Sequence, residues 1–211
     1  MPEQLSPTEA RIVGALVEKQ LTTPEYYPLT LNALVNACNQ KNNRDPVMSL
    51  DETTVTTSLE RLRDRNLVYV FYGSTSRVPK YKHMLPTFYE LEPSEVAVLA
   101  VLLLRGPQTL GELRERTGRM HEFSGLDEVQ QTLNALAQRD DPLVLRLERL
   151  PGQKDARFAH LLSGEIDLEA LVAAHPTRAA QSESANERIA KLEAEVMRLS
   201  AEFAEFRKQF E

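Results

Sequence analysis

The feature that most constrains this fold is a change in hydrophobic spacing that occurs twice along the chain. Apolar residues recur at helical spacing up to Leu62 and then give way to a β-branched and aromatic run at residues 67–72. The same change follows Leu136, where residues 143–150 alternate between apolar and polar side chains. Each change predicts that a group of helices ends and a β-hairpin begins, so the chain contains two units with the same order of elements.

The first unit shows its helix boundaries in capping residues and prolines. Ser6-Pro7-Thr8-Glu9 predicts a helix start, because Ser6 and Glu9 can form a capping box and proline suits the first helical position. A second helix is predicted over 29–38 and a third from Asp51. The strand at 67–72 can then return over 77–85 through the small, polar turn between them.

The second unit repeats this order with a different sequence. An apolar helix is predicted over 95–104, and Thr109-Leu110-Gly111-Glu112 is a second capping box that opens a short helix. A third helix follows over 127–139, and the strand at 143–150 is expected to pair with residues 156–162. The match between the units lies in element order.

Three helices followed by a hairpin is the winged-helix arrangement, in which the hairpin is the wing. A chain of 211 residues can hold two such domains. The expected class is therefore mainly α with small β wings (α+β), as two tandem winged-helix domains and a C-terminal amphipathic or coiled-coil helix. The predicted boundaries are 1–86, 87–163, a linker at 164–186, and the C-terminal helix at 187–211.

The C-terminal segment carries an unbroken heptad pattern. Its apolar residues follow at alternating spacings of three and four, as in a coiled-coil seam. They are Ile189, Leu192, Val196, Leu199, Phe203, Phe206 and Phe210. A homodimer through this helix is expected. Packing of the helix on its own domains and disorder are the alternatives, because phenylalanine is bulky for a two-stranded seam and three heptads are marginal alone.

The sequence shows no pattern typical of an enzyme, a metal site or a membrane protein. It contains no dinucleotide-binding, P-loop or nucleophile-elbow motif, and its four histidines lack metal-ligand spacing. The one cysteine, Cys38, falls on the inward stripe of a helix and is expected to be a buried thiol. The apolar run at 96–104 is shorter than the ~20 residues of a membrane helix. Without a secretion signal, a cytoplasmic protein with no cofactor and no enzymatic activity is expected.

Charge favours the first unit as a nucleic-acid-binding element. The net charge of the chain is −6, but residues 1–86 carry 10 basic and 9 acidic side chains, whereas residues 87–163 carry 9 and 12. The third helix and wing of a winged helix are the parts that meet DNA. The residues expected to contact double-stranded DNA are Thr53, Thr54, Thr57, Arg61, Arg77, Lys80 and Lys82.

Two carboxylates oppose this interpretation. Glu60 and Asp64 share the exposed helix face with Arg61, and carboxylates repel phosphate. We therefore expect a DNA-binding protein, with a transcriptional regulator as its class, and keep one alternative. In that alternative the tandem winged helices are an adaptor that binds another protein.

The run Ala37-Cys38-Asn39-Gln40-Lys41-Asn42-Asn43-Arg44-Asp45-Pro46-Val47-Met48, together with Leu59-Glu60-Arg61-Leu62 and Leu5-Ser6-Pro7-Thr8-Glu9, resembles the YceH-like family of uncharacterised bacterial proteins. The resemblance covers residues 5–165 and implies two winged helices, but no activity, ligand or site. The asparagine-rich run itself has two interpretations. It is either a rigid connector, because Asn and Asp bond nearby backbone, or a loop whose Lys41 and Arg44 contact phosphate or an acidic partner.

Overall fold

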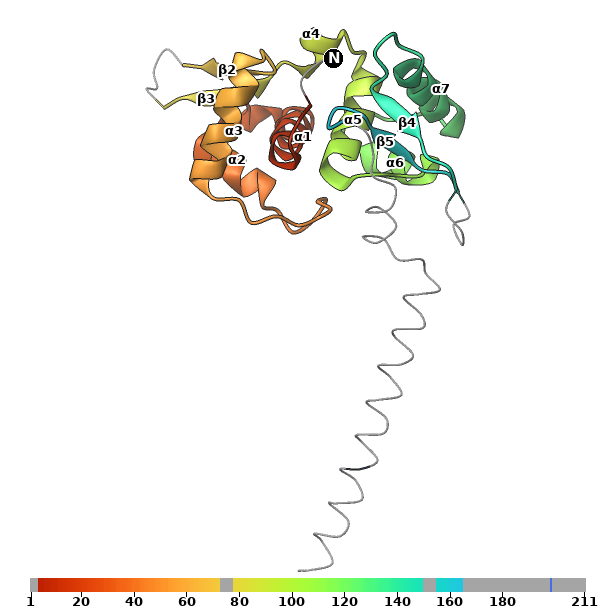
Figure 1. Cartoon of the computed structure of the whole chain (residues 1–211), viewed down its shortest axis with the longest axis horizontal. Helices are drawn as coiled ribbons and strands as arrows, with labels where there is room; N and C mark the ends of the chain where they lie inside the picture. Colours follow the sequence, from red (N-terminus) through yellow and green to blue (C-terminus); the bar gives the residue numbers. More distant parts are fainter. Residues whose placement is uncertain (1–3, 73–77, 150–154, 165–197, 199–211) are drawn as a thin grey trace, which may run out of the picture. The chain divides into compact units, whose positions relative to one another are not determined.

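The computed structural model describes residues 4–72, 78–149, 155–164 and Arg198 (Figure 1). All of these except Arg198 belong to one compact unit. The predicted linker and the seven predicted heptad residues lie outside the described residues, as does Arg77. Of that C-terminal segment, the structure describes only Arg198, which is helical and exposed.

The first half of the unit contains four helical segments and a three-stranded sheet. They are α1 (Pro7–Thr22), the 3-10 helix η1 (Pro24–Tyr26), β1 (Leu29–Thr30), α2 (Leu31–Cys38), α3 (Glu52–Asp64), β2 (Val68–Phe71) and β3 (Lys80–His83). The sheet is antiparallel in the order β1-β3-β2. The predicted capping box starts α1, since the Glu9 N–H donates to Ser6 Oγ at 3.2 Å and the Ser6 N–H donates to the Glu9 carboxylate at 2.7 Å.

The second half repeats the order of three helices and a hairpin. A short helix that the sequence analysis missed, α4 (Leu85–Tyr89), leads into it. The elements are α5 (Pro93–Arg105), α6 (Leu110–Thr117), α7 (Leu126–Ala137), β4 (Val144–Arg146) and β5 (Phe158–His160). The predicted mainly helical α+β class is confirmed, although each strand is shorter than its apolar pattern suggested.

Matching helix starts show that the halves are related in structure as well as in element order. Both α1 and α5 begin with proline after a capping residue, and both close a capping box with a glutamate, Glu9 and Glu95 respectively. The next helix in each half also starts in the same way, because the side-chain oxygens of Thr30 and Thr109 cap α2 and α6 respectively.

The hairpins correspond residue by residue. In the first, Val68 lies opposite His83, and β1 joins the sheet through Leu29 opposite Tyr81. In the second, Val144 lies opposite His160. Gln108 and Leu29 are equivalent, since each directly precedes the residue that caps the next helix. Gln108 forms a β-bridge with Phe158, two residues before His160, and Tyr81, the partner of Leu29, likewise lies two residues before His83. The sheet therefore has the same plan in both halves, with its third strand reduced to a single bridge in the second.

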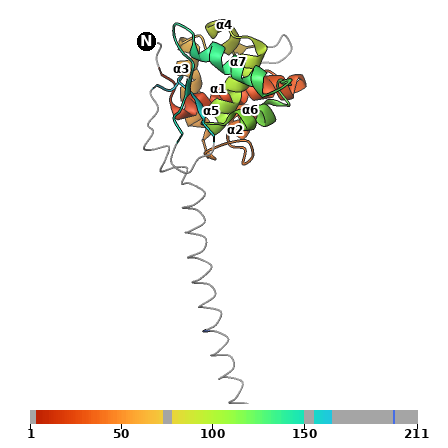
Figure 2. The same ribbon diagram turned by 90° about the vertical axis from the view of Figure 1, so that its right-hand side faces the viewer.

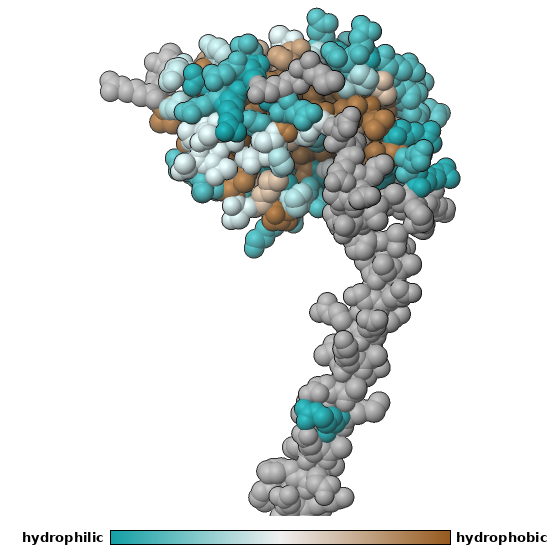
Figure 3. Space-filling model, in the orientation of Figure 1, coloured by the Kyte–Doolittle hydropathy of each residue, from teal (hydrophilic) through white to brown (hydrophobic). Residues whose placement is uncertain are grey.

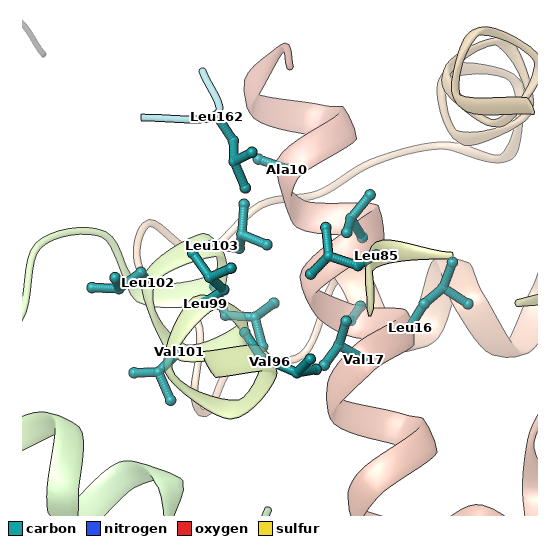
Figure 4. Close-up of a cluster of buried hydrophobic side chains, with 14 of the residues drawn as sticks. Ala10, Leu16, Val17, Leu85, Val96, Leu99, Val101, Leu102, Leu103 and Leu162 are labelled. Carbon is teal, nitrogen blue, oxygen red and sulfur yellow. The ribbon is translucent and has the colours of Figure 1, made fainter. Parts of the chain in front are cut away.

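The core that joins the halves lies between α1 and α5, which pack side by side at the centre of the unit (Figures 1 and 2). Both helices are buried on all sides over most of their length, at residues 9–17 and 95–104. Figure 4 shows Val96 and Leu99 of α5 between that helix and Val17 of α1. The apolar run that is too short for a membrane span is thus a central core helix.

Candidate nucleic-acid interface

Helix α3 presents one buried and one exposed face, as its spacing predicted. Val55, Leu59 and Leu62 are fully buried against the rest of the first half. Asp51 caps the start of the helix, because its carboxylate accepts the Thr54 N–H at 2.7 Å. This cap fixes which side chains face outward along the first turns.

The predicted threonines are exposed at the start of α3. Thr53, Thr54 and Thr57 all lie on the solvent side, while the Thr56 hydroxyl donates to the Glu52 carbonyl at 2.8 Å. Hydrogen bonds from Thr54 hold the pKa of Asp51 below its ordinary value. The hydroxyls can serve as contacts, but an ionised carboxylate stands beside them.

Arg61 is also exposed, one helical turn after Thr57. Glu60, Arg63 and Asp64 share the exposed part of this last turn, so two cations and two carboxylates lie close together on it. Arginine offers five donors in a planar fork and can reach either a phosphate or a base edge. The mixed charge that the sequence predicted for this face is therefore present in the structure.

The hairpin adds cations on one face of the sheet. Lys82 lies opposite Tyr69 and Lys80 opposite Phe71, so these four residues project to the same side of the two strands. The Lys82 ammonium lies 5.3 Å from the centre of the Tyr69 ring, a cation–π distance. Both lysines are partly exposed, and α3 packs against β2 beside them.

This hairpin also exposes more apolar surface than the sequence analysis anticipated. Exposed fractions are 55% for Tyr69, 43% for Phe71, 68% for Tyr72 and 52% for Val78. Figure 3 shows hydrophobic residues (brown) toward the outer end of the hairpin, at the left of the molecule. Aromatic rings beside lysines can stack on bases or pack against an apolar partner.

The loop that resembles the YceH-like family is held from inside by Arg44, which corrects the expectation of an Arg44 contact with an outside partner. The Arg44 side chain is completely buried, with Glu18 oxygens at 2.6 and 3.1 Å from its two terminal nitrogens. It also donates to the Ala37 carbonyl at 2.8 and 3.1 Å. With its donors used in this way, Arg44 is structural. Lys41 remains exposed.

Two further side chains anchor the same loop. Arg11, buried within α1, donates to the Cys38 carbonyl at 3.0 Å and to the Pro46 carbonyl at 2.6 Å. The Asn39 amide exchanges two 2.8 Å hydrogen bonds with the backbone of Leu50. These bonds favour the connector interpretation of the asparagine-rich run. No apolar pattern marks a buried arginine, so the sequence analysis missed Arg11.

Cys38 is buried at the end of α2, as expected. Burial raises the pKa of its thiol to about 12, against the opposing effect of Arg44 and Arg11, so the thiol stays protonated. Among the residues that the structure describes, no three His, Cys, Asp or Glu side chains gather closely enough to hold a metal ion. Within the same residues, every helix is too short or too polar to cross a membrane.

Comparison with known proteins extends the picture over most of the chain. Residues 5–153 match a family described as "Protein of unknown function, DUF480". The chain belongs to this family. A UPF0502 protein of Geobacter sulfurreducens is 52% identical over 98% of both chains, and one from Opitutus terrae is 61% identical over 78% of this chain and 72% of its own. The expected membership of a YceH-like bacterial family is confirmed, and none of these names carries an activity.

Proposed function

We propose that this DUF480 protein binds double-stranded DNA through α3 and the β2–β3 hairpin, with each half of the unit acting as a winged helix. The observation that carries the proposal is the contrast between equivalent helices. The exposed face of α3 carries hydroxyls and Arg61 beside the two hairpin lysines, whereas α7 contains no Lys or Arg. Phosphate neutralisation by such cations supplies most non-specific DNA affinity.

The test is fluorescence anisotropy of a labelled random-sequence duplex, titrated with the full chain at several salt concentrations. If one chain neutralises about three phosphates, the log–log salt slope is about −3 per chain. Lys80→Gln/Lys82→Gln should weaken binding several-fold and make the slope shallower by about 2.

The matched control removes the same charge from the other hairpin. Arg146 and Arg149 are exposed in the second half, so Arg146→Gln/Arg149→Gln lowers the net charge equally. The control variant should bind DNA within about twofold of the parent if the first hairpin makes the contacts. Equal losses in the two double variants would mean that only net charge matters, and the proposed interface would be wrong.

An adaptor function is the second candidate, favoured by the exposed Tyr69, Phe71, Tyr72 and Val78. Four large apolar side chains on one hairpin are typical of a surface that meets another protein. Absence of DNA binding at low salt, together with a stoichiometric complex that Phe71→Ser abolishes, would favour the adaptor over the DNA-binding protein.

The homodimer is part of the proposal and rests on the heptad spacing of the C-terminal segment alone. Light scattering of the full chain gives its molar mass. Leu192→Pro should convert a dimer to a monomer, because proline interrupts a helix through the seam. A monomeric parent chain would remove the dimer.

A further inference from the structure

A polar groove of about 710 Å³ opens where three helices end near one loop. Its walls come from the last turns of α1, α5 and α6 and from residues 40–43 of the asparagine-rich loop. The loop is fixed here by a hydrogen bond of 2.9 Å from the Asp45 N–H to the Leu104 carbonyl. This bond ties the loop wall of the groove to the end of α5, and the volume of the groove falls within the ~300–1,000 Å³ of small-molecule sites.

The groove concentrates positive charge in an otherwise acidic protein. The cations that line it are Lys19, Lys41, Arg105, Arg116 and Arg119. Two carboxylates, Glu18 and Glu115, are among the lining residues. Glu18 is already engaged by the buried Arg44 at 2.6 Å, so it offers little compensation to the others.

The contacts within the groove leave much of this charge unsatisfied. Arg116 lies 3.3 Å from Glu112, Arg105 donates to the Asn43 amide oxygen at 3.0 Å, and Lys19 lies 4.0 Å from Glu18. Burial, followed by the nearby charge of Arg116, lowers the pKa of Arg105, and the carboxylates of Asp45 and Glu112 oppose this shift only in part. Cations that repel one another in this way are stabilised when an anion joins them.

Helix dipoles explain only part of the arrangement. Lys19, Arg105 and Arg116 occupy the last turns of their helices, where the dipole favours a cation. Lys41 and Arg119 also line the groove, but both are exposed and lie outside any helix. A helix dipole therefore does not account for these two charges.

Three apolar residues also line the groove. Val101 and Leu104 of α5 are almost completely buried there, whereas Met120 is partly exposed and can be reached by a ligand. A ring can pack on Met120 while phosphates reach the cations, because arginine and lysine pair well with phosphate oxygens. We propose that this groove binds a small phosphorylated ligand that carries an apolar ring, such as a nucleotide.

The test is calorimetric titration of the full chain with ATP and, separately, with inorganic tripolyphosphate, in magnesium-free buffer of low ionic strength. One ATP is expected to bind per chain, more tightly than tripolyphosphate because its ring can contact Met120. Lys41→Gln/Arg116→Gln/Arg119→Gln should weaken ATP binding at least tenfold. The matched control Arg61→Gln/Lys80→Gln/Lys82→Gln removes the same charge elsewhere and should leave ATP affinity within twofold.

Each other outcome overturns the proposal. Absence of ATP binding, or equal loss in both triple variants, would show that the groove is no site. Tripolyphosphate affinity equal to that of ATP would remove the ring from the proposed ligand. If the groove variant unfolds, Arg119→Glu at the exposed end of the groove replaces it, with the same tenfold loss expected. The DNA titration should give the opposite ranking of the two triple variants, so each proposal can fail without the other.

Discussion

The two halves of this protein share the same pattern of buried residues but carry different exposed side chains. Helices α3 and α7 bury equivalent residues, Val55, Leu59 and Leu62 in one and Val129, Leu133 and Leu136 in the other. Even a buried hydroxyl is kept, because Ser58 and Thr132 each donate to the carbonyl four residues earlier, at 2.9 and 3.0 Å.

The outward positions of the same helices differ throughout. Where α3 has Thr53, Thr57 and Arg61, α7 has Asp127, Gln131 and Ala135. A fold constrains its buried positions strongly, because cavities and unsatisfied polar groups are costly, and constrains exposed positions weakly. A difference in function between α3 and α7 must therefore come from these outward side chains.

The largest effect is expected from Arg44, the buried residue that anchors the asparagine-rich loop of the first half. Arg44→Ala should lower the free energy of unfolding by about 3 kcal/mol, because it leaves Glu18 and the Ala37 carbonyl without their buried partner. Urea denaturation measures the change. Arg114→Ala, at an exposed position of α6, is the control and should change stability by less than about 0.5 kcal/mol. Similar losses in both variants would contradict a specific role for Arg44.

Glycines in the two halves should respond with opposite signs. A Cβ at Gly14 would lie 2.9 Å from Leu104 Cγ and 3.1 Å from Leu103 Cβ, so α1 and α5 would have to separate. Gly14→Ala should therefore destabilise the protein by about 1–2 kcal/mol, despite the higher helix propensity of alanine.

The matched substitution is Gly111→Ala in α6, where a Cβ meets nothing within 4 Å. It should stabilise the protein by about 0.5 kcal/mol through helix propensity. Thermal unfolding of both variants gives the comparison, and stabilisation by Gly14→Ala would show that the helix contact is looser than the structure indicates.

His83 and His160, which occupy equivalent positions in the two hairpins, should make the free energy of unfolding depend on pH. Burial, with a smaller effect of Lys82, lowers the pKa of His83 to about 4, and burial lowers that of His160 to about 4. The unfolded chain binds a proton below its pKa of about 6.5, whereas the folded protein does not until about 4. Stability should thus fall as pH drops through this window, by about 1.4 kcal/mol per unit for one fully shifted histidine.

Replacing each histidine separates the two contributions. His83→Phe and His160→Phe should each flatten the acid limb of the stability curve by a similar amount, because burial lowers the pKa of both imidazoles to about 4. Urea denaturation at pH 7, 6 and 5 supplies the slopes. A parent protein whose stability is constant over this range would refute the expectation for both residues.

The sequence was sufficient for features that depend on local pattern. Periodicity placed the two hairpins and the helices other than η1 and α4, and the capping boxes at Ser6 and Thr109 are present as predicted. The inward position of Cys38 followed from the same spacing. These signals are local because each depends on neighbours within one or two helical turns.

Features that depend on distant residues could not be predicted in this way. Arg11 and Arg44 are charged, and a hydrophobicity pattern places charged residues in solvent. Their partners are distant in sequence, because Arg11 bonds to Cys38, 27 residues away, and Arg44 bonds to Glu18, 26 residues away. β1 has two residues, too few to show an alternation. The groove draws cations from separate helices that become neighbours only when α1 packs on α5, so no segment of sequence displays it.

The smallest effect concerns one outward residue of α3. Arg61→Ala gives this helix the residue that α7 has at the equivalent position, Ala135. Because Arg61 is exposed, stability should change by less than about 0.5 kcal/mol. DNA affinity should fall several-fold, and the log–log salt slope should become shallower by about 0.9, the value for one phosphate contact. Anisotropy titrations at four salt concentrations measure both quantities.

A fall in affinity with an unchanged slope would mean that Arg61 contacts a base edge instead of phosphate. Unchanged affinity and slope would remove α3 from the interface and leave the hairpin as the only element that distinguishes the first half.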